Sequence, residues 1–426
     1  MNFDLLPADH FHITTARSSR KRPTLQNDII IGDGIDPVGD RRLADIARPG
    51  MRVVIAFTDA TRFSPDRLLV GALLSELIAL GISHDDITLL CATGLHRPMT
   101  PAERIAKLGD EIAETMRIVD HDALDNNHLT RLGEINGLPV VTNALCAEAD
   151  LLLATGVVEP HQYAGYSGGS KTIVIGCGGE ATIQGTHGAE MLDRAGTRLG
   201  AIDGNPFQEF VRAAGRLIGL DYVLNVLLDE DGAIIAAAAG EPDAVHDHLT
   251  ATARGEYEVT IDRPAHIVIA GVSPAKGANL YQASRAATYL ALSEGAPLLP
   301  GAPIILTAPI PEGAGDGTGE RRFFELLSSA KSPSALLSDL RADGFPAGAQ
   351  RAYILAQVLE RHPVIVVGAE HPEIVEACHM LAAPDLESGL ALAEELARKR
   401  FGMAFPEMLE LLVVPNALVT LPRVVG

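Results

Sequence analysis

The stretch ADLLLATGVVEPHQYAGYSGGSK, residues 149–171, joins an apolar run to a polar, glycine-rich turn. The run at 149–158 has the length and composition of a buried strand, as do the runs at 52–57 and 87–94. Residues 66–81 carry apolar side chains at helical spacing and end at a glycine. Strands that alternate with helices in this way predict βαβ units and a largely parallel sheet.

A second series of the same kind follows the polar stretch 253–264. Its expected strands are 266–272, 302–310, 363–369 and 408–417, and its expected helices are 280–295, 319–330, 349–362 and 388–400. We therefore predict an α/β fold of two Rossmann-like domains with largely parallel sheets. The predicted domains are residues 1–262 and 263–426, with an active-site cleft between them.

Composition excludes several classes of protein. The net charge of −21 makes nucleic acid an unsuitable partner, and an anionic ligand would need a local cluster of Arg and Lys. The four cysteines are scattered without C-x-x-C spacing, which argues against a disulfide scaffold and a structural zinc site. No segment is apolar enough to serve as a signal peptide or to cross a bilayer. We expect a cytoplasmic protein that does not bind a membrane.

The glycine-rich turn after 149–158 is similar to a phosphate-binding loop. Gly165 through Thr172 would fit G-x-x-x-x-G-K-[ST] if position 170 were glycine, but it is Ser170. Glycine residues let backbone N–H groups approach an anion, although an ordinary strand-to-helix turn fits the segment equally well. Lys171 lies among small and apolar residues, so it could act as a nucleophile or simply pair with a phosphate.

Three histidines, His96, His161 and His187, lie in loops close to expected strand ends. Ligands of parallel α/β sheets bind at this edge, and imidazole suits both proton transfer and metal binding. Their spacing names no particular metal.

Polar residues also follow two other elements. Asp59, Thr61 and Arg62 follow the strand 52–57, where Arg suits a carboxylate and Asp59 or Thr61 could equally cap the next helix. The segment 281–285 opens a helix and could equally form a solvated helical face.

Five motifs then identify a family by resemblance. The chain resembles the nickel-pincer lactate racemases, a family of 2-hydroxyacid racemases and epimerases, along nearly its whole length and in the same order. The motifs are DATR (59–62), TGLHR (93–97), EPHQYAGYSGGSK (159–171), GTHG (185–188) and YQASRA (281–286).

The resemblance implies a nickel pincer nucleotide, a pyridinium mononucleotide whose two thio groups hold the metal. Lys171 is then expected to be joined to this cofactor through a thioamide, and His187 to be the protein ligand of nickel. Gly168, Gly169 and Ser170 would help to hold the phosphate of the nucleotide. Cofactor-biosynthesis proteins would be required partners.

The resemblance also implies a mechanism. His96 and His161 would be the acid/base pair: one removes the hydroxyl proton while hydride leaves the substrate Cα for the cofactor, and a 2-oxo acid forms briefly before hydride returns to its other face. Arg62 would hold the substrate carboxylate. Asp59 and Thr61 would position the nucleotide or Arg62.

The C-terminal domain is expected to complete the substrate pocket with Tyr281, Gln282 and Arg285. The family has Lys where this chain has Arg285, and this chain lacks Trp altogether. Because Arg binds carboxylates bidentately, a dicarboxylic acid such as malate is a second candidate beside lactate.

Other classes of function stay open from the sequence. One is a non-catalytic protein that binds the cofactor, although such a protein would need neither His96 nor His161. An ATP-using kinase or ligase is disfavoured by Ser170 and by the lack of a recognisable Walker-B strand. The sequence leaves a homo-oligomer open as well.

Overall fold

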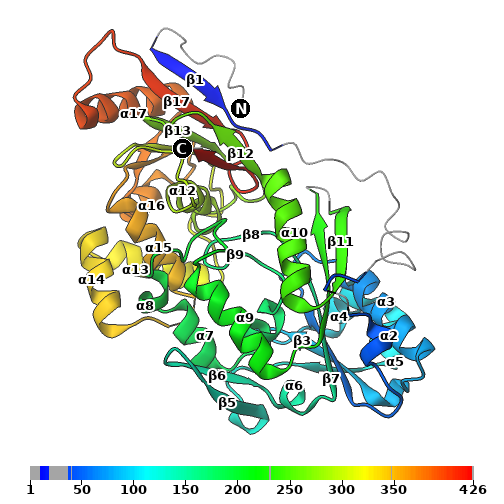
Figure 1. Cartoon of the computed structure of the whole chain (residues 1–426). Helices are drawn as coiled ribbons and strands as arrows, with labels where there is room; N and C mark the ends of the chain where they lie inside the picture. The colour runs from blue at the N-terminus through cyan, green and yellow to red at the C-terminus, as the bar shows by residue number, and fades with distance from the viewer. Residues whose placement is uncertain (1–9, 19–36, 40, 230–231, 347, 425–426) are drawn as a thin grey trace.

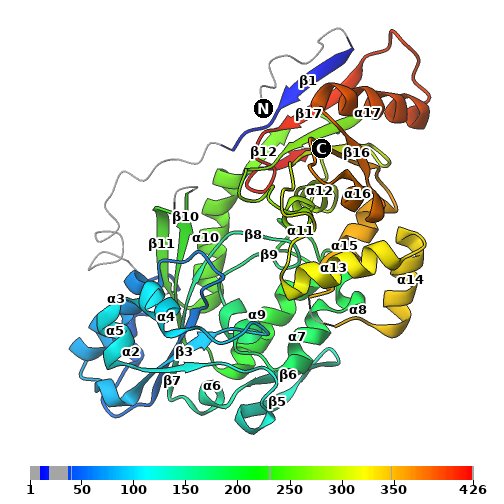
Figure 2. The same cartoon turned by 180° about the vertical axis from the view of Figure 1, so that it is seen from behind.

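The computed structural model describes residues 10–18, 37–39, 41–229, 232–346 and 348–424. Within them the chain forms two lobes, each built on a six-stranded sheet (Figure 1, Figure 2). We call residues 41–257 the first lobe, and residues 10–16 together with 258–424 the second lobe.

The sheet of the first lobe has the strand order β11-β10-β7-β2-β3-β4. All neighbouring strands are parallel except β10 and β11, which pair antiparallel. The strands are β2 (Val53–Thr58), β3 (Ile87–Ala92), β4 (Arg117–Asp120), β7 (Leu151–Val157), β10 (Tyr222–Leu228) and β11 (Ile234–Gly240). Val53, Ile55 and Phe57 belong to one apolar core and Val54 and Ala56 to another, so β2 is buried on both faces.

The sheet of the second lobe has the order β1-β17-β13-β14-β15-β16, and all of its pairs are parallel. The strands are β1 (Phe11–Thr15), β13 (Ile267–Gly271), β14 (Ile304–Thr307), β15 (Val364–Val367), β16 (Leu381–Ala383) and β17 (Leu409–Val414). Strand β1 comes from the start of the chain and lies along β17, with Phe11 opposite Leu409 (Figure 1).

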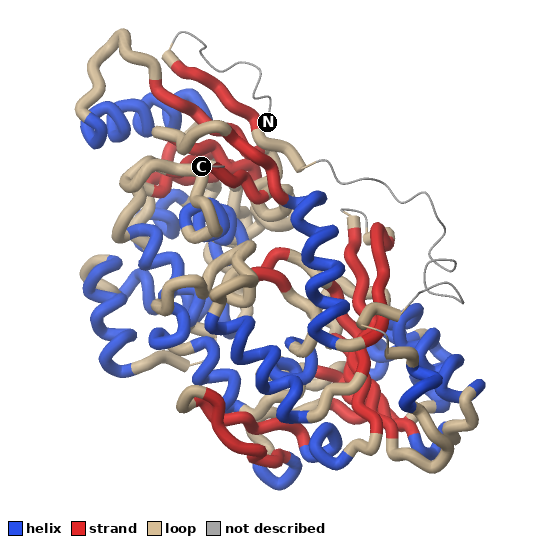
Figure 3. Tube along the Cα trace, viewed as in Figure 1, coloured by secondary structure: helices blue, strands red, loops and turns tan. Residues whose placement is uncertain are grey.

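Helices flank both sheets (Figure 3). In the first lobe they are α2 (Leu43–Ile46), α3 (Asp66–Ala79), α4 (Pro101–Leu108), α5 (Asp110–Thr115), α6 (Ala144–Glu148), α7 (Glu180–His187), α8 (Ala189–Leu192), α9 (Pro206–Ile218) and α10 (Pro242–Tyr257). In the second lobe they are α11 (Leu280–Ala283), α12 (Arg285–Ala291), α13 (Thr318–Ser329), α14 (Pro333–Asp343), α15 (Gln350–Leu359), α16 (Pro372–Ala377) and α17 (Leu386–Phe401).

Short elements complete the chain. They are the 3₁₀ helices η2 (His84–Asp86) and η3 (Asn126–His128), the π-helix η4 (Thr172–Gly176), and the strand pairs β5 (Leu129–Ile135) with β6 (Leu138–Asn143), β8 (Pro160–His161) with β9 (Gly165–Tyr166), and β12 (Glu258–Ile261) with β18 (Leu421–Val424). The β8–β9 pair lies between the two sheets in both views (Figure 1, Figure 2).

The two lobes share one apolar core. Its buried members include Ala56 and Leu152 of the first sheet and Val268 and Leu306 of the second. The two lobes are therefore packed against each other through a continuous apolar core.

The predicted α/β fold with two largely parallel sheets is confirmed. The expected helix 280–295 is shorter than predicted, because it divides at Ser284 and ends at Ala291. Strand β1 belongs by sequence to the predicted first domain, but it pairs with β17 in the sheet of the second lobe. The domain boundary at residue 262 stays a prediction. In the described part of the chain, no helix combines the length and apolarity that crossing a bilayer requires.

Candidate active site

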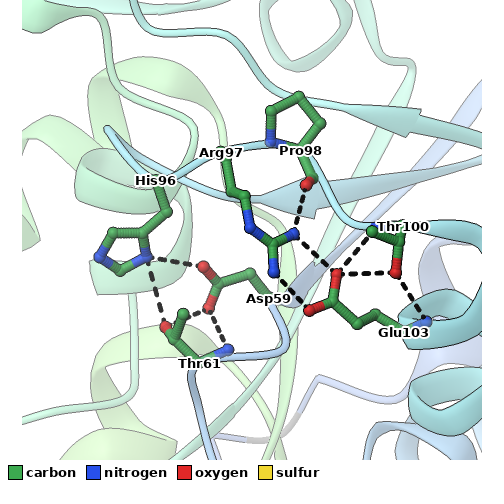
Figure 4. A network of polar contacts seen from close by, with 7 residues as sticks. All are labelled: Asp59, Thr61, His96, Arg97, Pro98, Thr100 and Glu103. Carbon is green, nitrogen blue, oxygen red and sulfur yellow. Dashed lines mark hydrogen bonds and ion pairs between the residues drawn. The ribbon is translucent and has the colours of Figure 1, made fainter. Parts of the chain in front are cut away.

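Asp59, Thr61 and His96 form a hydrogen-bonded group at the carboxyl ends of the adjacent strands β2 and β3 (Figure 4). The His96 Nδ1–H donates to Asp59 Oδ2 at 2.7 Å, and the Thr61 hydroxyl donates to Asp59 Oδ1 at 2.7 Å. Burial alone would raise the pKa of Asp59, but the hydrogen bonds from His96 and Thr61 outweigh it and lower that pKa. With Nδ1 protonated, the Nε2 lone pair of the exposed His96 is available to accept a proton.

Neither Asp59 nor Thr61 caps the next helix, which was the alternative role for these residues. Helix α3 has Pro65 at its N-cap and no side-chain cap.

The neighbouring Arg97 fixes the loop that carries His96. Its guanidinium donates to both carboxylate oxygens of Glu103, at 2.6 and 2.8 Å, and to the Pro98 carbonyl at 2.9 Å (Figure 4). Glu103 in turn forms the capping box of α4 with Thr100. Arg97 is therefore already paired and serves to position the loop.

The glycine-rich turn is packed against the protein itself. Gly168 and Gly169 have φ of +90° and +54°, and a Cβ at 168 would lie 2.6 Å from Val158 Cγ2. The N–H of Gly169 donates to Asn225 Oδ1 at 2.7 Å, and Ser170 is buried. Close packing explains these glycines, and the phosphate role of Gly168, Gly169 and Ser170 stays a prediction.

Lys171 is the N-cap of the π-helix η4, so the glycine-rich turn leads into a π-helix. Burial and, after it, the positive charge of Arg62 lower the pKa of Lys171 to about 7, although Glu159 partly opposes both. A large fraction of this amine is therefore uncharged near neutral pH, the state in which an amine is a nucleophile.

His187 ends helix α7 with one ring nitrogen already committed. Its Nδ1 lies 3.0 Å from the Ile183 carbonyl oxygen, which can only accept, so Nδ1 carries the proton and Nε2 carries the lone pair. Burial, with the charge of Lys171, lowers the pKa of His187 to about 4, so the ring is neutral at pH 7. A neutral imidazole oriented through its second nitrogen is the usual form of a metal-binding histidine.

His161 has the opposite arrangement. The backbone N–H groups of Tyr163 and Ala164 donate to its Nδ1 at 3.3 and 3.2 Å, so the neutral ring carries its proton on Nε2. Burial is the main cause of a pKa well below the usual range, and the charges of Lys171 and Arg62 add to it.

His161 and His187, both partly buried, contact the same two aromatic rings. The rings of His161 and His187 each lie 5.5 Å from the ring of Tyr163, in edge-to-face contact. Phe207 lies 6.2 Å from His161 and 5.2 Å from His187.

The second lobe contributes Tyr281, Gln282 and Arg285 from α11 and α12. Arg285 Nη2 donates to Tyr289 Oη at 2.6 Å, and its Nη1 lies 3.5 Å from Gln282 Oε1. The charge of Arg285 also contributes to the lowered pKa of His161, which places the two groups within electrostatic reach across the lobes.

Arg351, at the start of α15, lies in none of the five sequence motifs but belongs to the same site. Its guanidinium lies 4.1 Å from the centre of the Tyr281 ring, and Nη1 donates to the Tyr281 carbonyl oxygen at 3.4 Å. The available signal was a charged residue directly before the fully buried run 352–358.

The site is strongly cationic in an acidic protein. Across the described ranges, five basic side chains around it form no ion pair: Arg62, Lys171, Lys276, Arg285 and Arg351. Glu159 is the carboxylate that acts on Lys171, Lys276 and Arg285. This is the local positive cluster that an anionic ligand requires.

The structure thus brings most of the predicted site residues close together, and they form two separate groups. The Asp59–Thr61–His96 group is linked to the His161–Lys171–His187 group through Arg62, whose charge acts on Asp59 and on all three members of the second group. No hydrogen bond among the described residues joins His96 to His161.

Two further observations concern metal-binding side chains and surface hollows. In the described part of the chain, no three His, Cys, Asp or Glu side chains are grouped as a metal cage. Two surface hollows, one beside His12 and Glu410 and one beside Leu129 and Glu180, contain none of the predicted site residues.

Fold and site together indicate an α/β enzyme whose oriented histidines lie among cations that form no ion pair with a described residue. The sequence model of the lactate racemase N-terminal domain matches residues 2–200, and that of the lactate racemase C-terminal domain matches residues 262–413. The chain belongs to the lactate racemase family. The expectation of a lactate-racemase-like isomerase is confirmed at this level.

Individual relatives agree with this assignment. The chain is 32% identical to the lactate racemase of Thermoanaerobacterium thermosaccharolyticum, over 87% of this chain and 86% of that protein. It is 31% identical to the lactate racemase of Lactiplantibacillus plantarum, over 90% of this chain and 88% of that protein.

Solved structures agree as well. The lactate racemase apoprotein of T. thermosaccharolyticum superposes with a TM-score of 0.84 at 28% identity, over 98% of this chain and 96% of that one. A Thermotoga maritima protein has a TM-score of 0.63 at 18% identity, over 89% of this chain and 94% of that one, and shows the fold alone.

Proposed function

We propose that the protein is a racemase or epimerase of a small 2-hydroxy acid, acting with a nickel pincer nucleotide attached to Lys171. The observation that carries the proposal is the placement of the Lys171 amine, with its lowered pKa, within electrostatic reach of His187, whose Nε2 lone pair is free. An anchor and a metal ligand are the two attachments that the family cofactor needs from the protein.

The residues of the site fit this cofactor. Lys171 would hold it covalently, His187 would bind nickel through Nε2, and Asp59 and Thr61 would position the nucleotide or Arg62. When bound, the cofactor would supply a reversible acceptor for hydride.

His96 is the better placed of the two proposed acid/base histidines to act as a base. Asp59 holds its Nδ1 proton and leaves Nε2 to take the proton of the substrate hydroxyl. In the described geometry, His161 presents an Nε2–H that can donate a hydrogen bond to a substrate oxygen. If His161 is to act as the base, its proton must move from Nε2 to Nδ1, and Nδ1 would then face two backbone N–H donors.

Arg62 would bind the carboxylate next to the reacting carbon. It is exposed, forms no ion pair with a described residue, and its charge acts on both histidine groups. Tyr281, Gln282 and Arg285 would close the site from the second lobe.

The test is co-production of the protein with the cofactor-making enzymes. Intact mass and peptide mapping should show a nucleotide-sized adduct on Lys171, a nickel assay should show the metal, and chiral chromatography should show racemisation of a 2-hydroxy acid. Lys171→Ala should lose the adduct, whereas Lys331→Ala, at an exposed lysine, should retain it.

The remaining variants separate the roles. His187→Ala should lose nickel, while His96→Ala and His161→Ala should keep nickel and lose racemisation. A loaded protein that racemises no hydroxy acid would favour the cofactor-binding alternative. An unmodified mass without nickel, where a known lactate racemase is loaded, would reject the cofactor.

A further inference from the structure

The second lobe presents more positive charge to the site than one carboxylate needs. Arg285, Arg351 and Lys276 act electrostatically on one another, and none of them forms an ion pair with a described residue. Arg62 of the first lobe is already available for the carboxylate beside the reacting carbon.

Neither guanidinium is saturated by the protein. Each guanidinium has five N–H donors. Arg351 gives one hydrogen bond, to the Tyr281 carbonyl oxygen, and Arg285 gives one short hydrogen bond to Tyr289 Oη and a longer one to Gln282. Stacking on Tyr281 and Tyr289, with ring centres 4.1 and 5.2 Å away, fixes the planes of the two groups.

The arrangement is unfavourable without an anion. Burial lowers the pKa of Arg351, and the charge of Arg285 lowers it further. Two partly buried like charges repel each other, and a bound carboxylate would offset that repulsion. Stored repulsion of this kind is typical of binding sites for anions.

Arg285 and Arg351 act electrostatically on residues beside the histidines of the site. Arg285 and Arg351 both act on Tyr163, whose ring contacts His161 and His187. Arg62 acts on His161 from the first lobe and Arg285 acts on it from the second. His161 is thus within electrostatic reach of cationic side chains from both lobes.

We propose that Arg351, together with Arg285, binds a second carboxylate of the substrate, so that Arg351 selects dicarboxylic 2-hydroxy acids over monocarboxylic ones. This inference rests on the proposed function. The phosphate of the nucleotide cofactor is the other anion that could meet the same pair, and the experiment separates the two.

The experiment compares Arg351→Met with Arg361→Met in cofactor-loaded protein. Arg361 is an exposed arginine beyond the end of α15 and serves as the matched control. Loss of charged hydrogen bonds predicts a fall in kcat/KM for malate of about 10- to 100-fold, mostly through KM, with kcat/KM for lactate changed less than about threefold. Cofactor attachment and nickel content should equal those of the unaltered protein.

A binding measurement on the unloaded protein gives an independent readout. Succinate, which has two carboxylates and no hydroxyl to react, should bind more tightly than acetate in calorimetry, and Arg351→Met should abolish that difference. Retention of this preference in a protein that racemises nothing would uphold the second carboxylate site and reject the proposed function.

Two results would overturn the inference and leave the proposed function standing. One is an equal effect of Arg351→Met on malate and lactate. The other is loss of the cofactor from Arg351→Met, which would assign the pair to the nucleotide phosphate.

Discussion

The acidity of Lys171 gives a sharp prediction, because its pKa is lowered from 10.5 to about 7. The perturbation is pH, applied to protein without cofactor. At pH 7 about half of the Lys171 amines should be uncharged, against roughly 0.03% for an ordinary lysine. The ratio corresponds to an increase in reactive amine on the order of 10³-fold.

The assay is competitive labelling with acetic anhydride between pH 5 and 10, followed by peptide mapping. Lys171 should reach half of its maximal labelling near pH 7, corrected for its accessibility, while labelling of the exposed Lys331 continues to rise to much higher pH. Because the charge of Arg62 contributes to the lowered pKa, Arg62→Ala should shift the Lys171 profile to higher pH. A profile for Lys171 that parallels that of Lys331 would refute the reasoning.

Three further predictions concern other residues. His246 is 1% exposed, and burial is the main cause that lowers its pKa from 6.5 to about 4. As pH falls below 6.5 the unfolded chain therefore binds a proton at His246 that the folded chain does not bind, and the free energy of unfolding should decrease by about 2 kcal/mol between pH 7 and pH 5. Urea unfolding of His246→Gln should show a decrease that is smaller by this amount. Asp59→Asn should lower kcat about 100-fold without loss of nickel, because His96 loses the carboxylate that fixes its tautomer; an unchanged kcat would exclude that role. Asp193→Ala leaves Tyr353 and Gln357 of α15 and both donor atoms of Arg341 on α14 without their acceptor, so the free energy of unfolding should fall by about 1–3 kcal/mol while cofactor loading is unchanged. Equal stability in urea would show that this link between the lobes is weak.

Local patterns were sufficient for most of the fold. The runs at 52–57 and 87–94 form β2 and β3 because a continuous apolar run suits a strand buried on both faces, as in a parallel sheet covered by helices. Thr100 and Pro101 cap α4 as their types predict, and the capping box with Glu103 completes that start. The five residues of β1 carry no comparable signal, since their partner lies nearly 400 positions away in the chain.

The candidate site was predictable where its residues belong to a motif. His161 and Lys171 lie in one stretch, and His96 and Asp59 each follow a strand of the same sheet, so the resemblance and the parallel topology both point to them. Arg351 belongs to no such motif. It reaches the site because α15 packs against the helices that follow β13, and this arrangement is set by tertiary packing.

The pairing of β1 with β17 has a consequence for synthesis on the ribosome. The first sheet can close once residue 240 has emerged, whereas β1, made earlier, must wait for residues 409–414. A fragment starting at 263 would therefore leave one side of β17 without a hydrogen-bonding partner, a surface prone to associate with other chains. In the full chain β1 covers this side of β17, so a segment from the start of the chain protects the last strand of the second sheet to be made.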